Sequence, residues 1–560
     1  MKKFFKERLL ELLHKNTLDS YRVKVNNSNT LFHELQNLII DWNDGKIKRF
    51  ETLKLSAEEL LYFLKDDDCI SYGKFHKEVV IQILKDFIKS DVNTKKGEHD
   101  YTLYILSVLI IKNENAYLNC LFSKIDSLII QDANQQNFVL FDRYLNSLIA
   151  ELIRVGYAKS YLYIISKYAF NSGNFDENYR RYKETLLNRH FDFYHIFFKL
   201  TFEDVSIIPE RDNLLREIPE EIVNDPASLN FEPQENIRYF YIKENALDAH
   251  TALRKSKLSL STFLDKIHIS LGLSQVELGK MSIVKKESNT RTYLTNNEYV
   301  VDGVYKDGSS FIDVDATLSK VIESTAVYMD VKERINSALR HFRLGNCASD
   351  LEQKFINYWI GLEFIFSVPE KDISTFARIK EHLPVVLSCG YIKRNLTSID
   401  NMFVVEKESS GLGDKKLWDF EASDFTNIEH FVESSLKKYR LSKVKSLILG
   451  ATEKRSEYLK NHEKFVKWHL VRLYRLRNEL IHDAAIKNNI VQVTSDLRYY
   501  LAYILNQLLM FFSALECDNV KSEYSINDFF YEYSIVRKNI EKDFSVDVIF
   551  SVAVEFDLIK

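Results

Sequence analysis

Apolar residues recur every three or four positions along most of the chain. In the segment FDRYLNSLIAELIRVGYAKSYLYIISKYAF, residues 141–170, they fall at i, i+3, i+4 and i+7. This spacing gathers them on one face of an α-helix, and such faces pack against one another in a core. The same pattern covers most of residues 1–208. We therefore predict a helical N-terminal region, which by its position is a candidate sensor or regulator.

A cluster of prolines marks the end of this region. Residues 1–208 contain no proline, whereas four of the six prolines in the chain lie between 209 and 233. Proline lacks an amide hydrogen and interrupts regular elements. We predict a linker over residues 209–235.

Shorter apolar runs follow over residues 236–315. The segments NIRYFYIK and QVELGKMSIVKK favour strands because they are rich in β-branched and aromatic residues, and the intervening NALDAHTALRKSKLSLSTFLDKI has helical spacing. Asp302-Gly303, between two apolar runs, predicts a hairpin turn. The alternating polarity of GSSFIDVD, residues 308–315, favours another strand. These patterns predict a small α+β module.

Helical spacing returns over residues 316–518. It is interrupted by the polar segment EKESSGLGDKKLWD, which predicts a loop. The last long helix is expected to open at Thr494, Ser495 or Asp496, since each side chain can cap free amide groups. Residues 519–560 form a mixed C-terminal tail. The predicted fold class is mainly α: a helical N-terminal region, a small α+β middle module and a C-terminal all-α bundle.

Composition and charge agree with a globular protein. Apolar residues make up 46% of the chain, charged residues 28%, and the formal net charge is -4, so a polyanion would need a local basic patch. The five cysteines are scattered without a C-x-x-C pair, which favours a reducing cytoplasm over a disulfide scaffold or a zinc module. YTLYILSVLII, the most apolar run, is about half of a bilayer span. No membrane segment is predicted.

A local basic patch precedes the segment RNELIH at 477–482. Residues 454–477 contain eight basic and two acidic side chains. Such a patch is suited to phosphate contacts, although a solvated helix face gives the same pattern. The candidate RNA-binding side chains are Lys464, Lys467, Arg472 and Arg475.

An arginine and a histidine with four to six residues between them are common in this chain. The spacing also occurs at Arg8 and His14, Arg189 and His195, and Arg334 and His341. The pair Arg477 and His482 differs because Asn478 follows the arginine, four residues before the histidine and therefore on its helix face. An earlier helix carries Phe355, Trp359, Leu362 and Phe366 on one stripe, with Glu363 beside it.

Together these residues resemble a known family. ALRHFRL and KFINYWIGLEFIF, followed by RLRNELIH, are similar to the HEPN superfamily, most of all to its ApeA-like branch of bacterial defence proteins. The resemblance covers about 320–518, and the α+β module with ENALDAHTAL resembles more loosely the region that precedes the HEPN domain.

The resemblance implies a metal-independent endoribonuclease of an abortive-infection system, without a cofactor. Its catalytic residues would be Arg477, Asn478 and His482, supported by Trp359 and Glu363. The expected partners are RNA, such as tRNA, a phage-derived trigger, and a second copy of the chain, because HEPN domains pair to form one composite cleft. No metal ligands are implied.

The residue types suit this chemistry independently of the resemblance. RNA carries a 2'-hydroxyl beside each phosphate, so cleavage needs a base, an acid and a cation for the transition state. A histidine can transfer protons near neutral pH, and an arginine binds phosphate oxygens with a fork of donors. Arg477 and His482 would lie about 140° apart on an ideal helix. Either the helix loosens near His482, or two subunits supply the two side chains.

Other interpretations remain open. His482 could be a helix-terminal histidine favoured by the macrodipole, and Arg477 could be a structural partner of Glu363. The whole domain could then be a non-catalytic HEPN-like module that binds RNA, a nucleotide or a protein. Asp313 and Asp315 share their spacing with metal-binding nucleotidyltransferases, but alternation on a strand explains them better.

Overall fold

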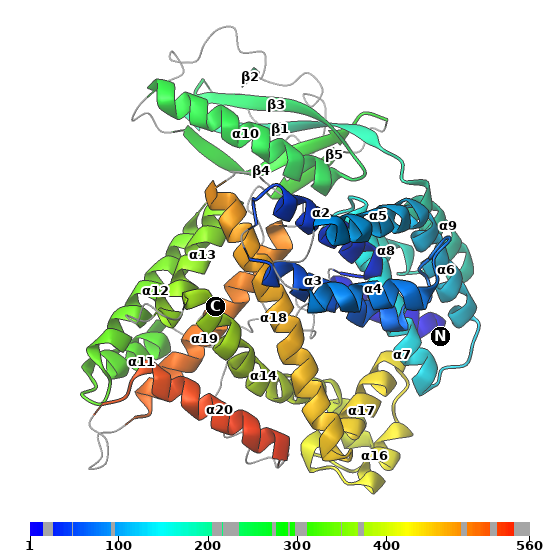
Figure 1. Ribbon diagram of the computed structural model, residues 1–560, viewed down its shortest axis with the longest axis vertical. Coiled ribbons are helices and arrows are strands. Elements are labelled where there is room, and N and C mark those ends of the chain that lie inside the picture. The colour runs from blue at the N-terminus through cyan, green and yellow to red at the C-terminus, as the bar shows by residue number, and fades with distance from the viewer. Residues whose placement is uncertain are drawn as a thin grey trace.

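Helices dominate the part of the chain that the structure describes, which confirms the predicted mainly α class (Figure 1). The computed structural model describes residues 1–14, 26–47, 49–90, 96–203, 215–216, 235–271, 276–288, 292–296, 311–348, 350–367, 374–482, 490–515 and 523–542. The predicted turn at Asp302-Gly303 lies outside these residues. Among them, no helix combines the length and the apolar character that crossing a bilayer requires.

The N-terminal region is helical as predicted and has its own hydrophobic core. Apolar faces such as Phe141, Leu145, Leu148 and Leu152 are buried in it, at the spacing that predicted the helix. The helices of this region are α1 (Lys2–Leu13), α2 (Ser28–Asn43), α3 (Glu51–Asp66), α4 (Lys77–Lys89), α5 (Lys96–Asn113), α6 (Ala116–Ile129), α7 (Gln135–Arg154), α8 (Lys159–Ala169) and α9 (Phe175–Asn188).

A five-stranded antiparallel sheet follows, in the order β2-β3-β1-β4-β5. Its elements are β1 (Asp192–Phe202), β2 (Leu215–Arg216), β3 (Ile237–Ala246), α10 (Ala249–Leu271), β4 (Val276–Lys286) and β5 (Thr292–Asn296). Helix α10 packs on the sheet, where Phe263 meets Phe240 with the ring centroids 4.8 Å apart. The predicted strands at 236–243 and 275–286 and the helix between them are therefore confirmed.

The predicted start of this module is wrong. The central strand β1 lies before the proline cluster, inside the region predicted to be helical, and the edge strand β2 lies inside the predicted linker 209–235. The prolines mark a connection between two strands of one sheet rather than the border of the module. The aromatic-rich sequence of β1, DFYHIFFKLTF, is itself typical of a strand.

The C-terminal region is a helical bundle around a second core. Its elements are α11 (Phe311–Glu323), α12 (Met329–Cys347), α13 (Leu351–Phe366), α14 (Thr375–Met402), α15 (Val404–Ser409), the 3-10 turn η3 (Leu417–Asp419), α16 (Ala422–Glu429), α17 (Ser435–Ile448), α18 (Thr452–His482), α19 (Ile490–Ser513) and α20 (Ile526–Lys542). Helix α18 runs through the middle of the molecule (Figure 1).

Two local predictions for this region are wrong and a third is partly confirmed. Residues 311–315 begin helix α11 rather than a strand, because Val314, Leu318 and Val321 continue at helical spacing. The predicted loop 406–419 is confirmed over residues 410–416, but its start belongs to α15 and its end to η3. Helix α19 begins at Ile490, so the expected capping residues, Thr494 to Asp496, lie buried within it.

The predicted C-terminal tail contains a core helix. Phe529, Phe530 and Tyr533 of α20 are buried in the same core as α14 and α18. The bundle therefore continues past residue 518 to Lys542, the last described residue.

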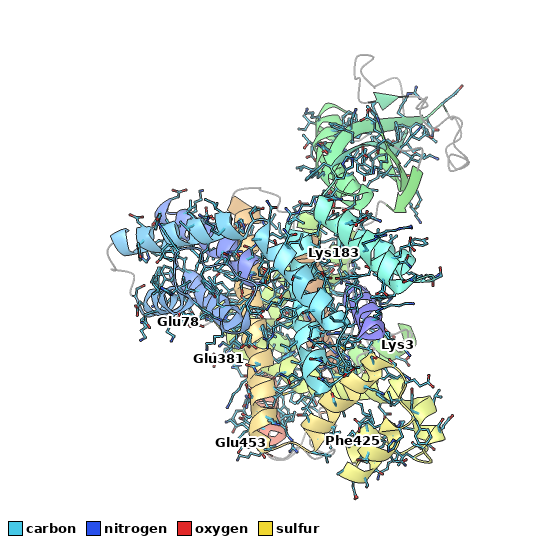
Figure 2. All side chains as sticks on the ribbon, turned by 90° about the vertical axis from the view of Figure 1, so that its right-hand side faces the viewer. Lys3, Glu78, Lys183, Glu381, Phe425 and Glu453 are labelled. Atoms are coloured by element: carbon cyan, nitrogen blue, oxygen red, sulfur yellow. The ribbon has the colours of Figure 1, made fainter. Side chains whose placement is uncertain are left out.

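Helix α17 belongs to both cores. Leu436 and Tyr439 are buried among the N-terminal helices, whereas Leu441 and Val444 are buried in the C-terminal core. In Figure 2, α1, marked by Lys3, lies directly beside α17. The two helical regions are therefore joined through α17.

Helices α14 and α19 approach closely at Gly390. A Cβ atom at this position would overlap the hydroxyl oxygen of Tyr503. Gly390→Ala, which in an open helix stabilises by about 0.5–1 kcal/mol, is therefore expected to lower the free energy of unfolding by about 1–3 kcal/mol through overpacking. Urea unfolding measures this change. Thr397→Ala, on an exposed turn of the same helix, is the control, and equal effects of the two variants would contradict the prediction.

Candidate functional site

The candidate site lies on the last turns of α18. Leu473, Leu476 and Leu480 are 0%, 8% and 8% exposed, so one face of the helix is anchored in the C-terminal core. Tyr474 stacks on Phe376 with the ring centroids 4.0 Å apart. This packing fixes the rotation of the helix and leaves the opposite side for polar groups.

Arg477 is held by a chain of polar contacts that starts in the core. The indole Nε1 of Trp359, a fully buried residue, donates a hydrogen bond of 2.7 Å to Oε1 of Glu363. The same oxygen lies 3.7 Å from Nη2 of Arg477, whose Nη1 donates to Oδ1 of Asn478 at 3.2 Å. The contact between Arg477 and Glu363 is the one that the structural interpretation of Arg477 expected, and the catalytic role of Arg477 stays a prediction.

The guanidinium nevertheless remains open to solvent. The side chain of Arg477 is 28% exposed and that of Glu363 is 29% exposed. One acid and one amide hold the guanidinium from one side, and solvent reaches the other. Such an arrangement orients a cation without enclosing it and leaves donors for an anionic ligand.

His482 is the final residue of α18, and its side chain lies outside the described residues. The backbone is α-helical up to that position, so the turn of about 140° between Arg477 and His482 applies. Of the two expected ways to unite these side chains, loosening of the helix before His482 is not found in the described backbone. How the side chains of Arg477 and His482 are placed relative to each other stays a prediction.

The other arginines with this spacing have structural roles. The side chains of Arg8 and Arg334 are 2% and 10% exposed, and each is paired with an aspartate, at 2.7 and 2.6 Å respectively. Arg189 ends α9 in the left-handed conformation. Arg477 is therefore distinguished from Arg8 and Arg334 by its exposure, and from all three arginines by the Asn478 that follows it.

Two of the four predicted RNA-binding side chains are engaged within the chain. Nε of Arg472 donates to both oxygens of Glu34, at 3.0 and 2.9 Å, and Nη2 donates to Glu59. Nη1 of Arg475 donates to Glu34 at 3.1 Å. The prediction for Arg472 and Arg475 is corrected: carboxylates of α2 and α3 take the place that phosphates were expected to occupy. Lys464 and Lys467 are exposed, as their assignment requires.

The protonation of this network follows from burial and charge. Burial raises the pKa of the Glu34 carboxyl, but Arg472 and Arg475 outweigh it, so the pKa lies below its ordinary value. For Glu59 burial dominates, and the pKa is raised despite Arg472. Sequence reasoning missed both acids because they precede Arg472 by more than 400 residues and no local pattern distinguishes them from other helix-surface glutamates.

The two other histidines of α18 are structural. Burial, reinforced by the nearby Arg394, lowers the pKa of His462 far below its ordinary value. Burial and then Arg472 lower the pKa of His469 to about 3. Both imidazoles are therefore neutral near pH 7, and neither is suited to accept a proton there.

Groups that could hold a metal ion are scarce in the described part of the chain. Asp67, Asp68 and Cys69 bring their ligand atoms within 4.8 Å of one another. The two carboxylates already accept hydrogen bonds from tyrosine hydroxyls, Tyr117 to Asp67 and Tyr144 to Asp68.

Comparisons with protein-family models, with curated proteins and with solved structures find no match for this chain.

Proposed function

We propose that the chain is a metal-independent endoribonuclease of the HEPN type, acting in the bacterial cytoplasm as an abortive-infection effector against phage. The observation that carries the proposal is the Arg477 guanidinium, which Glu363 and Asn478 orient on a core-anchored helix while it stays open to solvent. It stands in the segment RNELIH, where the resemblance to HEPN ribonucleases implies the catalytic motif.

The proposed reaction uses the nucleophile that RNA itself carries. The 2'-hydroxyl attacks the adjacent phosphorus as its proton passes to a base, and the bond to the 5'-oxygen breaks as that oxygen takes a proton from an acid. The products are a 2',3'-cyclic phosphate and a 5'-hydroxyl. His482 transfers protons, Arg477 stabilises the charged transition state, and Asn478 orients the guanidinium or the phosphate.

A second copy of the chain would complete the site. Because α18 is helical up to His482, the backbone positions of residues 477 and 482 in one chain lie about 140° apart around the helix axis. Two helices meeting end to end around a two-fold axis would bring two histidines to one cleft, one as base and one as acid. The protein is therefore proposed to act as a homodimer, or as a higher assembly of dimers, on an RNA such as tRNA.

The alternative is a HEPN-like module that binds RNA, a nucleotide or a protein without cutting. The contact between Arg477 and Glu363 favours it, because an ion pair is a complete structural role for an arginine. In this alternative the same surface would bind RNA through Lys464 and Lys467, and the RNA would stay intact.

The test is cleavage of a defined RNA by the purified full chain in the presence of EDTA. We expect fragments whose 5' ends accept phosphate directly and whose 3' ends become free hydroxyl groups only after the cyclic phosphate is opened and the remaining phosphate is removed. The matched control is the same RNA with a 2'-deoxynucleotide at each cleavage position, which removes the nucleophile. Cleavage of this control at the same rate, or cleavage that EDTA abolishes, would contradict the proposed mechanism.

Infected and uninfected cells test the biological part of the proposal. Cells expressing the chain are expected to fragment RNA and stop growing after phage infection, since a phage-derived trigger is part of the proposal. If RNA stays intact in infected cells and in the purified reaction, the ribonuclease proposal fails and the binding module replaces it.

A further inference from the structure

Two cysteines that lie far apart in the sequence meet inside the N-terminal region. Cys69 stands in the short irregular segment between α3 and α4, and Cys120 lies on α6. The thiol of Cys69 donates a hydrogen bond to the thiol of Cys120, so the two sulfur atoms are in contact. The pair belongs to the N-terminal core and is separate from the candidate site on α18.

Polar contacts on both sides of the two cysteines fix their approach. The hydroxyl of Tyr117 donates to Asp67 at 2.7 Å, and Nζ of Lys124 donates to Asp68 at 2.5 Å. Tyr117, Cys120 and Lys124 are spaced by three and then four positions on α6 and therefore share one face of the helix. Two anchors, one on each side of Cys120, thus hold the segment that carries the other cysteine against that face.

The backbone beside Cys69 is also held in place. Its amide nitrogen donates to Oδ1 of Asp67 at 3.0 Å. Two positions later, the amide nitrogen of Ser71 donates to Oδ1 of Asn113 at 2.8 Å, and Nδ2 of Asn113 donates to the carbonyl oxygen of Ser71 at 2.9 Å. Asn113 is the last residue of α5 and is fully buried. Cys69 is therefore held between α5 and α6.

The two thiols differ in their access to solvent. Cys69 is 5% exposed, and burial, followed by the hydrogen bond to Cys120, raises the pKa of its thiol, which therefore stays protonated near pH 7. Cys120 is partly exposed. A dissolved oxidant therefore reaches Cys120 first, with the thiol of Cys69 directly beside it.

We propose that Cys69 and Cys120 form a reversible disulfide when the chain meets a peroxide. The bond would join the segment after α3 to α6 and enclose α4 and α5 in one covalent loop. In a reducing cytoplasm such a bond is transient, as is usual for regulatory rather than structural disulfides. The inference is independent of the proposed function, because the bond is measured without RNA.

The reaction proceeds in two balanced steps. The sulfur of Cys120 attacks one oxygen of hydrogen peroxide, the O–O bond breaks, and the thiol proton leaves with the second oxygen as water, so that Cys120 becomes a sulfenic acid. The sulfur of Cys69 then attacks the sulfur of Cys120, the S–O bond breaks, and the proton of the Cys69 thiol leaves with that hydroxyl as a second water. Two thiols are thereby oxidised by two electrons, and one peroxide is reduced to two waters. The contact of the thiols suits the second step, because the sulfurs must approach to about 2.05 Å from positions that are already adjacent.

Peptide mapping by mass spectrometry tests the proposal on the purified full chain. The chain is reduced, treated in the folded state with a small excess of hydrogen peroxide, and then unfolded in N-ethylmaleimide, which blocks every remaining thiol. We expect a peptide pair joined through Cys69 and Cys120 that is absent from the untreated sample and lost again after dithiothreitol. Oxidation of Cys120 to a sulfinic acid while Cys69 is fully blocked, a bond from Cys120 mainly to another cysteine, or no reaction of either thiol would overturn the proposal.

Variants and thermal unfolding test whether the bond fits the folded chain. Cys120→Ser, at a partly exposed position, should abolish the linked peptide, whereas Cys347→Ser, at the exposed end of α12, should leave its yield within twofold. Because the bond closes a long loop in the unfolded chain, the peroxide-treated unchanged chain and Cys347→Ser should each melt a few degrees above peroxide-treated Cys120→Ser. A linked chain that melts at or below the temperature of treated Cys120→Ser would show that the two residues are not placed for the bond, and would refute the proposal.

Discussion

Replacing His482 by alanine is expected to slow RNA cleavage by about 10²–10⁴-fold, the usual contribution of a general acid or base. Replacing Arg477 by alanine is expected to slow it by about 10²–10³-fold, because the transition state loses a preorganised cation. Arg477→Lys should recover little, since an ammonium group cannot donate in the fork that a guanidinium forms. The single-turnover rate on a defined RNA, with RNA binding measured in parallel, gives these values.

Two controls separate catalysis from a structural role. His268→Ala removes an exposed histidine from the last turn of α10, the same kind of helix position as His482, and should leave the rate unchanged. Glu363→Gln keeps an acceptor for Trp359 but removes the charge beside Arg477. If Arg477 serves only that ion pair, Glu363→Gln and Arg477→Ala will have equal effects.

Added guanidinium provides a further discriminator. At millimolar concentration it is expected to restore part of the activity of Arg477→Ala and none of that of His482→Ala. An Arg477→Ala variant that cuts RNA as fast as the unchanged chain would remove Arg477 from the mechanism. If the unchanged chain binds RNA without cutting it and Arg477→Ala no longer binds RNA, the non-catalytic binding module is supported.

Replacing Arg472 by methionine is expected to lower the free energy of unfolding by about 3–5 kcal/mol at pH 7, as for other broken buried ion pairs. The side chains of Arg472, Glu34 and Glu59 are 15%, 14% and 5% exposed. Without Arg472, Glu34 keeps Arg475, whereas among the described residues Glu59 keeps a hydrogen bond of 3.2 Å from Asn26 and no cation within ion-pair distance. The carboxylate of Glu59 would then be buried without a charged partner in the described structure.

The pH dependence of this loss has a definite sign. The pKa of Glu34 is lower in the folded than in the unfolded chain, so its contribution is present above the unfolded pKa and disappears as the pH falls through the folded value. The difference between the unchanged chain and Arg472→Met should therefore be largest near pH 7 and shrink below about pH 4.5. Urea unfolding at both pH values measures it.

Two controls accompany Arg472→Met: one breaks an exposed ion pair, and the other removes the charges of the two buried acids. Arg181→Met breaks an exposed pair with Glu177 within α9 and should change stability little. Combining Arg472→Met with Glu34→Gln and Glu59→Gln removes the unpaired charges and should recover much of the loss. A single Arg472→Met variant as stable as Arg181→Met would show that the network contributes nothing.

The sequence predicted those features that depend on short spacing. The helical face formed by Phe141, Leu145 and Leu148 and the strand at 236–243 are confirmed, because the spacing of apolar residues was enough to predict them. The segment FIDVD shows the limit of this reasoning. Five residues fit alternation and helical spacing equally well, and Leu318 and Val321 decide for the helix.

Features that depend on tertiary packing could not be predicted in this way. The sequence of β1 is typical of a strand, but its place in the sheet depends on its partners β3 and β4, which lie beyond the prolines that suggested a border. Likewise, the basic patch before Arg477 has two members whose charges are neutralised by Glu34 and Glu59, and a charge count along one helix cannot include acids from another region. The predicted catalytic pair rests on the resemblance and on the exposure of Arg477.

Helix α17 also limits how this chain can evolve. The ring of Tyr439 packs against Phe4 and Phe138, with centroids 5.4 and 6.2 Å apart, and its hydroxyl donates to Asp142 at 2.7 Å. An N-terminal half made alone would lack this ring and expose the two phenylalanines to water, at a cost proportional to the apolar area uncovered. Recombination that exchanges only the first half of the chain would therefore separate the N-terminal core from the α17 residues that complete it. New N-terminal halves can be acquired only together with a matching α17, so diversification by point substitution is favoured over exchange of modules.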